Sequence, residues 1–514
     1  MMAHTSFAEL IRSAGAAFHH GDADISISDV QYDSRQVKPG DLFVALRGGY
    51  ADGHAFLEDA RRRGAVAALV EEPSGAKDFT AVAVAGNTRE ALAPLSARFF
   101  DYPGEHLGVI GITGTDGKTT TSYMIDAMLR HNGLITGLVG TIAIRVGTDV
   151  LEHDTRQTTP ESLEVQRLLA RMRDAHVDWA VLEATSHALA LYRLNECPFD
   201  IGVITNVTRE HLDFHGTVEA YREAKAQLLR KIESRSDRPF PRVAVVNRDD
   251  EGARQLGDGT SLPVTWFSTR DQSAEIFARN IDVHEQGTSF DITLHGESSR
   301  VNLQQIGSYN VLNAMAAAGA GDAIGLDLPA IRGGLEALPF VPGRMQRVVR
   351  GQPFNVIVDY AHSPASLEET LRLARSVTSG RLLVVSGSAG ERDRGKRPVQ
   401  GRICADLADY AVFTSEDPRF EDPHLIIQEI ADGAVSAGAL RGKDFEMIED
   451  RRTAIDHVIS RACPGDTVLL AGKGHETCII YEDQRVPWNE ADVAEELLAM
   501  QGYDQNVQNA EGQT

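Results

Sequence analysis

The stretch Leu107–Thr121 reads LGVIGITGTDGKTTT, and its three parts together decide the fold of the region around it. Its first seven residues form a short apolar run rich in β-branched side chains, the pattern of a buried strand. The run breaks into Gly114-Thr-Asp-Gly117, and Lys118 then opens a segment with helical apolar spacing. A glycine loop between a strand and a helix N-terminus attracts anions through its backbone N–H groups, the helix dipole and the lysine. The stretch therefore predicts a phosphate cradle.

The spacing of this loop departs from the strict P-loop pattern. That pattern requires glycine where Ile112 stands, and the chain offers Gly111 and Gly114 instead. A glycine-rich turn that carries a surface lysine would fit the same residues. The strand before the loop and the helix after it favour a nucleoside-triphosphate site, in which Thr119 or Thr120 would place a hydroxyl on Mg²⁺.

Length and charge limit the possible functions of the chain. A chain of 514 residues should hold about three domains. Its net charge of −23 argues against a nucleic-acid backbone as partner. The four cysteines are scattered without metal-type spacing, and the chain shows no signal peptide, which together predict a reducing cytoplasm. The longest apolar runs are strand-sized, so we expect no membrane insertion.

The first 105 residues have the pattern of a small α/β domain. Helical spacing covers Phe7–Ala17, and a strand is expected at Leu42–Leu46. Asp33-Ser34-Arg35 could be a binding motif or ordinary turn chemistry, and the residues alone do not separate the two. A linker is expected near Tyr102–Gly104.

Strands and helices alternate from residue 106 to 341, which predicts a mostly parallel, doubly wound sheet. Glu183 follows the apolar run at 179–182, and His211 comes soon after the run at 201–204. Ligands of open α/β sheets gather at the carboxyl ends of strands, so we expect both side chains beside the phosphate cradle. Both are ligand types for a divalent cation. Lys225 lies on a predicted helix, and its position alone suggests a solvated face.

The alternation resumes from residue 342 to 502, which predicts a second doubly wound domain. Its expected strands at 356–358, 382–385, 410–413 and 467–470 each run into a polar turn. The tail, 503–514, is polar and rich in Gln and Asn, and we expect it to be disordered.

Ten motifs occur in order along the chain. They are DSR at 33–35 with PGDLF at 39–43, GITGTDGKTT at 111–120, Glu183 to His187, TNVTREHLDFHG at 205–216, Ala224-Lys225, GSYNVLNAMAA at 307–317, PGRMQRV at 342–348, DYAHSP at 359–364, GERDRGKRP at 390–398 and AGKGHE at 471–476. Through them the chain resembles the Mur ligase family, and most closely its UDP-N-acetylmuramoyl-tripeptide synthetases. The resemblance implies an N-terminal domain (1–105) that binds the UDP moiety, a central P-loop ATPase domain (106–341) and a Rossmann-like C-terminal domain (342–502) that binds the amino acid.

The resemblance also implies a reaction. An ATP-dependent ligase of this type adds a diamino acid to the D-Glu carboxylate of UDP-N-acetylmuramoyl-L-alanyl-D-glutamate through an acyl phosphate, in peptidoglycan precursor synthesis. ATP and Mg²⁺ are the implied cofactors, and we expect a monomer. The implied catalytic residues are Lys118, Glu183, His211 and Lys225. The implied metal ligands are Thr119, Glu183, His211 and Lys225, the last as a carbamate.

The resemblance implies the remaining site residues. Positions matching ATP contacts on both sides of the family's cleft are Gly114, Thr115, Asp116, Gly117, Lys118, Thr119, Thr120, Asn310, Arg344 and Asp359. Positions matching UDP-substrate contacts are Ser34, Thr158, Thr159, Thr185 and Arg193. Positions matching amino-acid contacts are Arg392, Glu416, Asp417, Pro418, Arg419, Gly472 and Glu476. The family usually has glutamine two residues before the substrate arginine, where this chain has Leu191.

The amino acid that is added depends on Glu416-Asp417-Pro418-Arg419. Family members that add meso-diaminopimelate usually read Asp-Asn-Pro-Arg. Arg419 favours a distal carboxylate. Asp417 would repel that carboxylate, or would pair with Arg419 and neutralise it. Both routes favour L-lysine or L-ornithine over diaminopimelate.

Two other functions fit parts of the sequence. Folylpolyglutamate synthetases share the central fold and the acyl-phosphate route, but residues 1–105 and the 416–419 region argue against them. A nucleotide-binding homologue without turnover is the other alternative. The presence of Lys118, Glu183, His211 and Lys225 argues against it.

Overall fold

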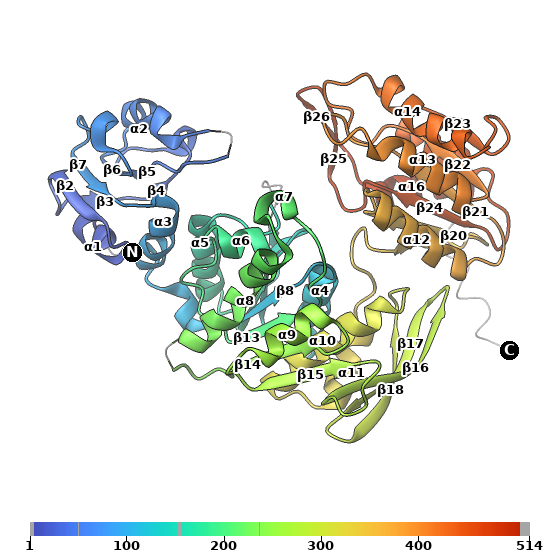
Figure 1. Cartoon of the computed structure of the whole chain (residues 1–514), viewed down its shortest axis with the longest axis horizontal. Helices are drawn as coiled ribbons and strands as arrows, with labels where there is room; N and C mark the ends of the chain where they lie inside the picture. Colours follow the sequence, from blue (N-terminus) through green and yellow to red (C-terminus); the bar gives the residue numbers. More distant parts are fainter. Residues whose placement is uncertain (1–4, 50, 152–156, 236, 504–514) are drawn as a thin grey trace. The chain divides into compact units, whose positions relative to one another are not determined.

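The computed structural model describes residues 5–49, 51–151, 157–235 and 237–503 (Figure 1). The tail that we expect to be disordered lies, from Asp504 onward, outside the described residues. The chain divides into two compact units. The first comprises Met1–Arg279, Asp291–Ser299 and Leu312–Ala337, and the second comprises Asn280–Phe290, Arg300–Val311 and Leu338–Thr514.

The N-terminal region is a small α/β fold. Its five-stranded sheet has the order β2 (Ala17–Gly21), β7 (Ala81–Val84), β6 (Ala67–Val70), β5 (Leu42–Val44) and β4 (Val30–Gln31). The helices are α1 (Phe7–Ser13), α2 (Leu57–Arg63) and α3 (Thr88–Phe99), and β1 (Thr5–Ser6) pairs with β3 (Ser26–Ile27). The predicted first helix is shorter than expected, because the chain turns at Gly15, whose φ is +62°, and enters β2.

The central sheet has eleven strands. Their order is β11 (Asp149–Leu151), β10 (Ile144–Val146), β9 (Thr136–Val139), β12 (Trp179–Glu183), β8 (Gly108–Thr113), β13 (Ile201–Ile204), β14 (Val243–Asn247), β15 (Val264–Ser268), β16 (Ile276–His284), β17 (Gly287–Leu294) and β18 (Glu297–Leu303). The strands from β9 to β16 in this order are parallel, whereas β10 is antiparallel to both of its neighbours. The strands predicted around residues 107, 179 and 201 are confirmed.

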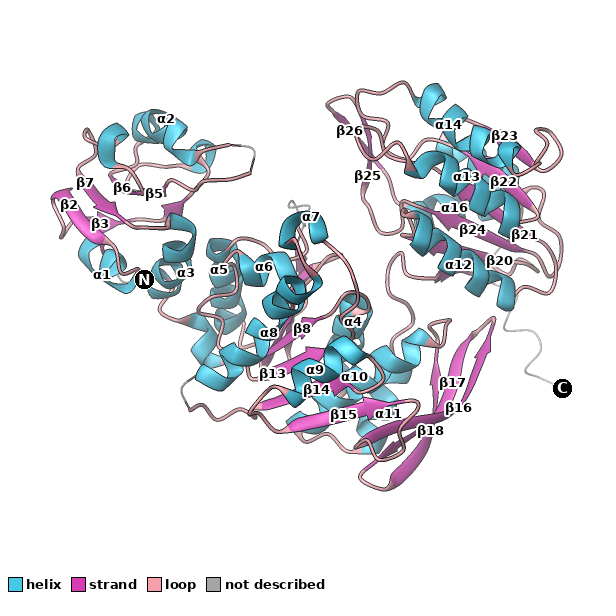
Figure 2. Cartoon of the chain, in the orientation of Figure 1, coloured by secondary structure: helices cyan, strands magenta, loops and turns pink. Residues whose placement is uncertain are grey.

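Helices lie on both sides of this sheet (Figure 2). They are α4 (Lys118–His131), α5 (Ser162–Asp174), α6 (Ser186–Ala190), α7 (Leu212–His215), α8 (Val218–Ser234), α9 (Glu251–Asp258), α10 (Tyr309–Ile324) and α11 (Leu328–Glu336). On one side, Val109 of β8 and Leu182 of β12 share a hydrophobic core with Leu169 of α5 and Leu228 of α8. A Cβ on Gly111 would come within 2.6 Å of Leu228, so this glycine lets α8 approach the central strand closely.

The C-terminal region has a six-stranded sheet of order β19 (Gln346–Val348), β20 (Asn355–Asp359), β24 (Thr467–Ala471), β21 (Leu382–Ser386), β22 (Tyr410–Phe413) and β23 (Phe445–Met447). All neighbours are parallel except β19 and β20. The helices are α12 (Pro364–Ser376), α13 (Lys396–Leu407), α14 (Pro423–Ser436), α15 (Arg451–Ile459) and α16 (Glu490–Met500), and β25 (Cys478–Tyr481) pairs with β26 (Gln484–Pro487). Separate hydrophobic cores include Leu367 of α12 and Ile455 of α15, so the sheet is covered on both faces.

Among the described residues, no helix has the length and apolar character needed to cross a membrane.

Candidate active site

The phosphate loop follows β8 and ends at the first turn of α4. Two of its glycines are required by their surroundings. A Cβ on Gly114 would lie 1.8 Å from Thr205 Oγ1, and one on Gly117 would lie 2.3 Å from Asn313 Oδ1. Gly117 also has a φ of +82°, a region that other residues adopt only with strain. The loop backbone is therefore packed against neighbouring polar side chains.

Hydrogen bonds fix the shape of the loop. Asn206 Oδ1 accepts hydrogen bonds from the backbone N–H groups of Thr115 (3.0 Å) and Asp116 (2.8 Å). The Thr205 hydroxyl donates to the carbonyl of Asp116 at 2.6 Å. The half-buried Lys118 donates to the loop carbonyls of Gly114 (2.9 Å) and Thr115 (2.7 Å). The cation is thus held at the loop where the sequence predicts phosphates.

Glu183 lies at the carboxyl end of β12, beside the loop, and its side chain is fully buried. Its Oε2 accepts hydrogen bonds from the hydroxyls of Thr119 and Thr141, both at 2.9 Å. Its Oε1 accepts the backbone N–H of Thr141 at 3.0 Å. No ion pair to Glu183 is found within the described part of the chain. A buried carboxylate that meets only neutral donors suits a divalent cation that would supply the missing positive charge.

His211 is the N-cap residue before α7; it has a φ of +53° and is more exposed than Glu183. Its ring packs edge-to-face on His187, with centroids 4.7 Å apart, and its Nε2 lies 3.6 Å from Glu210. Burial, followed by the charge of His211, lowers the pKa of His187. The His211 ring also lies 6.3 Å from that of Tyr221, and no contact between His211 and Glu183 is found in the described part of the chain. Among the described residues, no three His, Cys, Asp or Glu side chains converge as a metal-binding group.

Lys225 is buried, contrary to the solvated face suggested by its position in the sequence. Its Nζ donates to the carbonyl of Gly114 at 2.6 Å and lies 4.4 Å from the ring centre of Tyr221. Burial, followed by repulsion from Lys118, holds the pKa of Lys225 well below its usual value. The buried stripe of α8 reads Tyr221, Ala224, Lys225, Leu228, Leu229 and Ile232. This helical spacing could have shown that the lysine faces the core.

Three of the predicted UDP-substrate residues lie close to Glu183. The Thr159 hydroxyl donates to the carbonyl of Glu183 at 2.7 Å and lies 3.2 Å from Thr185 Oγ1. Thr158 Oγ1 lies 3.0 Å from the hydroxyl of Thr141, which itself binds Glu183. Ser34 lies apart from them, buried at the start of a short 3₁₀ turn in the N-terminal fold.

Arg193 is held by a carboxylate that sequence reasoning missed. Glu161 Oε1 accepts hydrogen bonds from Nε of Arg193 (3.0 Å) and from Arg89 of α3 (2.6 Å). Arg193 also donates to the carbonyl of Thr159 at 3.1 Å. The other carboxylate oxygen of Glu161 is buried and has no hydrogen-bond partner among the described residues. The sequence signal was an acidic residue directly after Thr158-Thr159-Pro160.

The second unit contains three of the predicted ATP residues. Asp359, at the end of β20, accepts the backbone N–H groups of Met345 (2.8 Å) and Ala361 (2.9 Å), and burial raises its pKa. Arg344 stacks over the ring of Tyr360 at 4.9 Å. The side chain of Asn310 donates to the carbonyl of Ile306 at 2.9 Å.

Of the predicted amino-acid residues, Glu416 lies against Gly472. A Cβ on Gly472 would lie 2.8 Å from Glu416 Oε2, a buried oxygen that has no hydrogen-bond partner in the described part of the chain. Arg419 has a φ of +54°, and its backbone N–H donates to Ile480 of β25 at 3.0 Å. Its side-chain Nε is buried and has no partner among the described residues. Arg392 is exposed in the loop before α13.

Of the two alternatives for Asp417, the described residues show no pairing with Arg419. Asp417 Oδ1 instead accepts hydrogen bonds from the fully buried Lys473 and from the backbone N–H of Ile480, both at 3.0 Å. Lys473 also binds Glu476 at 2.5 Å. Burial works to lower the pKa of Lys473, but the carboxylates of Glu476 and Asp417 overcome it and raise that pKa. The sequence did not indicate this pairing, because Lys473 comes from a turn 56 residues away along the chain.

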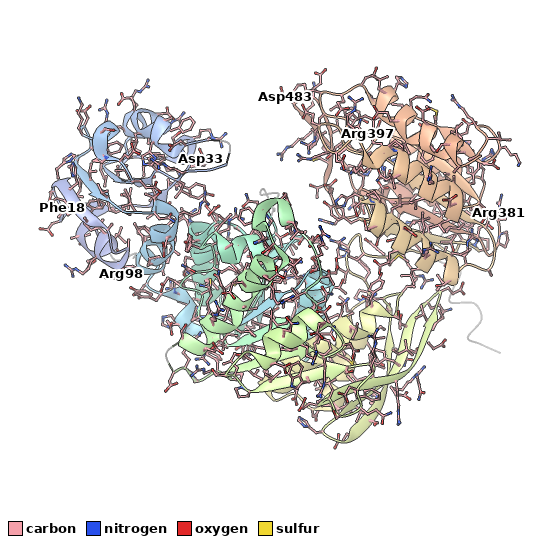
Figure 3. All side chains as sticks on the ribbon, in the orientation of Figure 1. Phe18, Asp33, Arg98, Arg381, Arg397 and Asp483 are labelled. Carbon is pink, nitrogen blue, oxygen red and sulfur yellow. The ribbon has the colours of Figure 1, made fainter. Side chains whose placement is uncertain are left out.

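Arg397 ties down the loop that carries Arg392 (Figure 3). Its guanidinium is fully buried and binds Glu421 at 2.9 Å and Glu429 of α14 at 2.7 Å. It also donates to the carbonyl of Ala389 at 3.3 Å. The structure therefore gives the arginines of the 390–398 motif different environments, with Arg397 internal and Arg392 in solvent.

Comparison with known proteins identifies the class. Three family models match the chain: the Mur ligase family catalytic domain over residues 26–99, the Mur ligase middle domain over 112–321, and the Mur ligase glutamate ligase domain over 343–474. The chain belongs to the Mur ligase family and is an ATP-dependent, amide-bond-forming ligase.

Within the family, it groups with the tripeptide synthetases. It is 44% identical to a UDP-N-acetylmuramyl-tripeptide synthetase of Roseiflexus sp. (strain RS-1), over 96% of this chain and 99% of that protein. It is 39% identical to a UDP-N-acetylmuramoyl-L-alanyl-D-glutamate–2,6-diaminopimelate ligase of Syntrophomonas wolfei, over 95% and 98%. A solved structure of such a diaminopimelate ligase matches with a TM-score of 0.68 and 30% identity, over 97% of this chain and 99% of that one.

Proposed function

We propose that this ligase joins a free diamino acid to the D-Glu carboxylate of UDP-N-acetylmuramoyl-L-alanyl-D-glutamate, with ATP as the energy source. The observation that carries the proposal is the arrangement of the phosphate loop. Lys118 and Lys225 both donate hydrogen bonds to one loop carbonyl, and the buried Glu183 lies beside the loop. The names of the relatives, which cover nearly the whole chain, support the UDP-muramoyl dipeptide as substrate.

The proposed reaction has two steps. A carboxylate oxygen of the dipeptide attacks the γ-phosphorus of ATP, and ADP leaves. The amine of the diamino acid then attacks the acyl-phosphate carbon, loses a proton, and the tetrahedral intermediate expels phosphate to leave an amide. Two anions must meet in the first step, so Lys118 would lower its barrier by neutralising charge on the phosphates.

Mg²⁺ fits the loop because Glu183 is buried, has no cationic partner among the described residues, and accepts a hydrogen bond from the Thr119 hydroxyl. Bound there, the ion would neutralise phosphate charge and polarise the transferring group. Thr119 and Glu183 would hold it, with His211 and a modified Lys225 as further ligands.

The modification of Lys225 that we propose is carbamylation. A lysine amine must be neutral to attack the carbon of CO₂, and burial together with Lys118 favours that neutral form. The attack forms an N–C bond and releases a proton, so the amine becomes a carbamate anion. This supplies an anionic oxygen ligand where the sequence has a lysine.

The proposal is tested by phosphate release from ATP in the presence of UDP-N-acetylmuramoyl-L-alanyl-D-glutamate, Mg²⁺ and a diamino acid. Release that requires all components, with a product whose mass equals dipeptide plus diamino acid minus water, is the expected result. Turnover only with a folyl substrate would assign the chain to the folylpolyglutamate synthetase alternative. The absence of any turnover would support the non-catalytic alternative.

A further inference from the structure

Thr141 lies in the turn between β9 and β10, outside all ten motifs of the sequence. Strand β9 runs parallel to β12, and the register pairs Val139 with Leu182, so the chain leaves β9 beside Glu183. The turn comes very close to this carboxylate, because a Cβ on Gly140 would lie only 2.2 Å from Glu183 Oε1. The fold therefore brings Thr141 to the buried carboxylate of the active site.

Thr141 holds both carboxylate oxygens of Glu183. Its backbone N–H donates to Oε1 at 3.0 Å, and its hydroxyl donates to Oε2 at 2.9 Å. Rotation of the carboxylate would break both bonds, and Glu183 is fully buried, so water could not replace them. The hydroxyl of Thr119 in the phosphate loop donates to the same Oε2 at 2.9 Å and lies 3.2 Å from the Thr141 hydroxyl. Thr141 thus fixes the orientation of Glu183 relative to the phosphate loop.

The hydroxyl of Thr141 also connects Glu183 to a predicted UDP-substrate residue. Thr158 Oγ1 lies 3.0 Å from this hydroxyl. A hydroxyl has one proton to donate, and Thr141 gives its proton to Glu183, so Thr158 must donate to Thr141. The result is a directed chain of hydrogen bonds that runs from Thr158 through Thr141 to the carboxylate. Hydrogen bonds in such a chain polarise and strengthen one another.

We propose that Thr141 is a positioning residue that links the two halves of the active site. It holds Glu183 in a fixed orientation for a divalent cation, and through Thr158 it ties that orientation to the UDP substrate. The inference rests on the proposed function and goes further by assigning a role to a residue outside the motifs. Loss of the Thr141 hydroxyl would remove a donor to Glu183 and the acceptor of Thr158, so both halves of the site should be affected together.

Three variants isolate the effect of this hydroxyl. Thr141→Val has nearly the same shape and keeps the backbone N–H, whereas Thr141→Ser keeps the hydroxyl as well. The matched control is Thr136→Val, at the opposite end of the same strand. It removes a hydroxyl that donates to the buried Asp126 at 2.6 Å, so it loses the same kind of hydrogen bond.

The first measurement is the binding of Mn²⁺ alone, followed by electron paramagnetic resonance. Thr141→Val should weaken this binding about tenfold, as expected when a hydrogen bond to a charged group is lost. Thr141→Ser should restore the binding, and Thr136→Val should bind Mn²⁺ as the wild type does. This measurement does not depend on turnover.

The second measurement is the KM for the UDP-muramoyl dipeptide in a double-mutant cycle. Thr141→Val and Thr158→Val should each raise this KM about tenfold. Because both variants break the same chain of hydrogen bonds, the double variant should be no worse than Thr158→Val alone. Independent contributions would instead multiply to about a hundredfold.

The outcomes separate this inference from the proposed function. Unchanged Mn²⁺ binding in a folded Thr141→Val overturns the inference, and so do KM effects that multiply in the double variant. An equal loss in Thr136→Val also overturns it, because the loss of any buried hydroxyl bond would then suffice. If Thr141→Val does not fold, Thr141→Ala removes the same hydroxyl and is judged by the same results. Failure of the wild type to release phosphate would instead count against the proposed function, while the Mn²⁺ comparison would still decide whether Thr141 positions Glu183.

Discussion

Lys118 and Lys225 donate to the same carbonyl oxygen, that of Gly114, at 2.9 and 2.6 Å. Two ammonium groups on one oxygen repel each other, and the buried one loses its proton more readily. The loop therefore combines a half-exposed cation, suited to phosphate, with a buried amine of lowered pKa. Conversion of the buried amine to an anion would replace this repulsion by attraction.

Lys118→Ala should abolish formation of the acyl phosphate. The cation that neutralises the phosphates is lost, and we expect a decrease in ATP turnover of at least a thousandfold, about 4 kcal/mol of barrier. Phosphate release under saturating ATP measures it. Lys443→Ala, at an exposed lysine, serves as the control and should retain full activity. Near-normal turnover of Lys118→Ala would contradict the assignment of the phosphate loop.

Lys225→Ala should be nearly inactive, and Lys225→Glu should recover part of the activity by supplying a ligand oxygen. Short-chain carboxylates should partly rescue the alanine variant, whereas bicarbonate should not. With ¹³C-labelled bicarbonate, NMR should detect a carbamate signal in the wild type that is absent from Lys225→Ala. If Lys225→Ala retains most of the wild-type activity, the lysine has only a structural role.

Gly117→Ala should destabilise the loop more than Gly133→Ala does. Both glycines have a φ close to +80°, so both substitutions strain the backbone by about 1 kcal/mol. At Gly133 a Cβ meets nothing within 4 Å, whereas at Gly117 it would lie 2.3 Å from Asn313. We expect loss of ATP turnover only in Gly117→Ala. Equal melting temperatures and activities in the two variants would contradict the close packing of the loop.

Glu161→Gln should raise the KM for the UDP-muramoyl dipeptide about tenfold, because a charged hydrogen bond that orients Arg193 is weakened. The KM for ATP should stay the same, and Glu161→Asp should be intermediate. Initial rates at varied substrate concentrations separate these effects, with Glu482→Gln as an exposed control. An equal increase in both KM values would indicate a general loss of structure rather than a role in positioning.

Stability should fall as the pH rises from about 4.5 to about 7. Burial raises the pKa of Glu164 from 4.5 to about 7, and Tyr32 donates to its carboxyl at 3.1 Å. In this range the folded protein binds a proton that the unfolded chain releases, so each step up in pH favours unfolding. The group contributes at most about 3 kcal/mol. Glu164→Gln should flatten the dependence in thermal unfolding followed from pH 5 to pH 8. A slope equal to that of the wild type would assign the dependence to other groups.

The sequence predicted the parts of the protein that depend on neighbours along the chain. The strands ending at Thr113, Glu183 and Ile204 follow from short apolar runs, and the phosphate loop follows from glycines between a strand and a helix. Such patterns are local, because strand and helix periodicity and the φ of glycine are properties of a few consecutive residues. The family motifs added the reaction type.

Tertiary structure alone decided which charges meet. Burial of Lys225 depends on which face of α8 packs on the sheet, and its low pKa depends on Lys118, which lies over 100 residues away. Asp417 is paired with Lys473 rather than with Arg419, two residues on, because β22 and β24 bring their following turns together at one end of the C-terminal sheet. Electrostatic energies depend on distance and burial in space, and spacing along the sequence fixes neither.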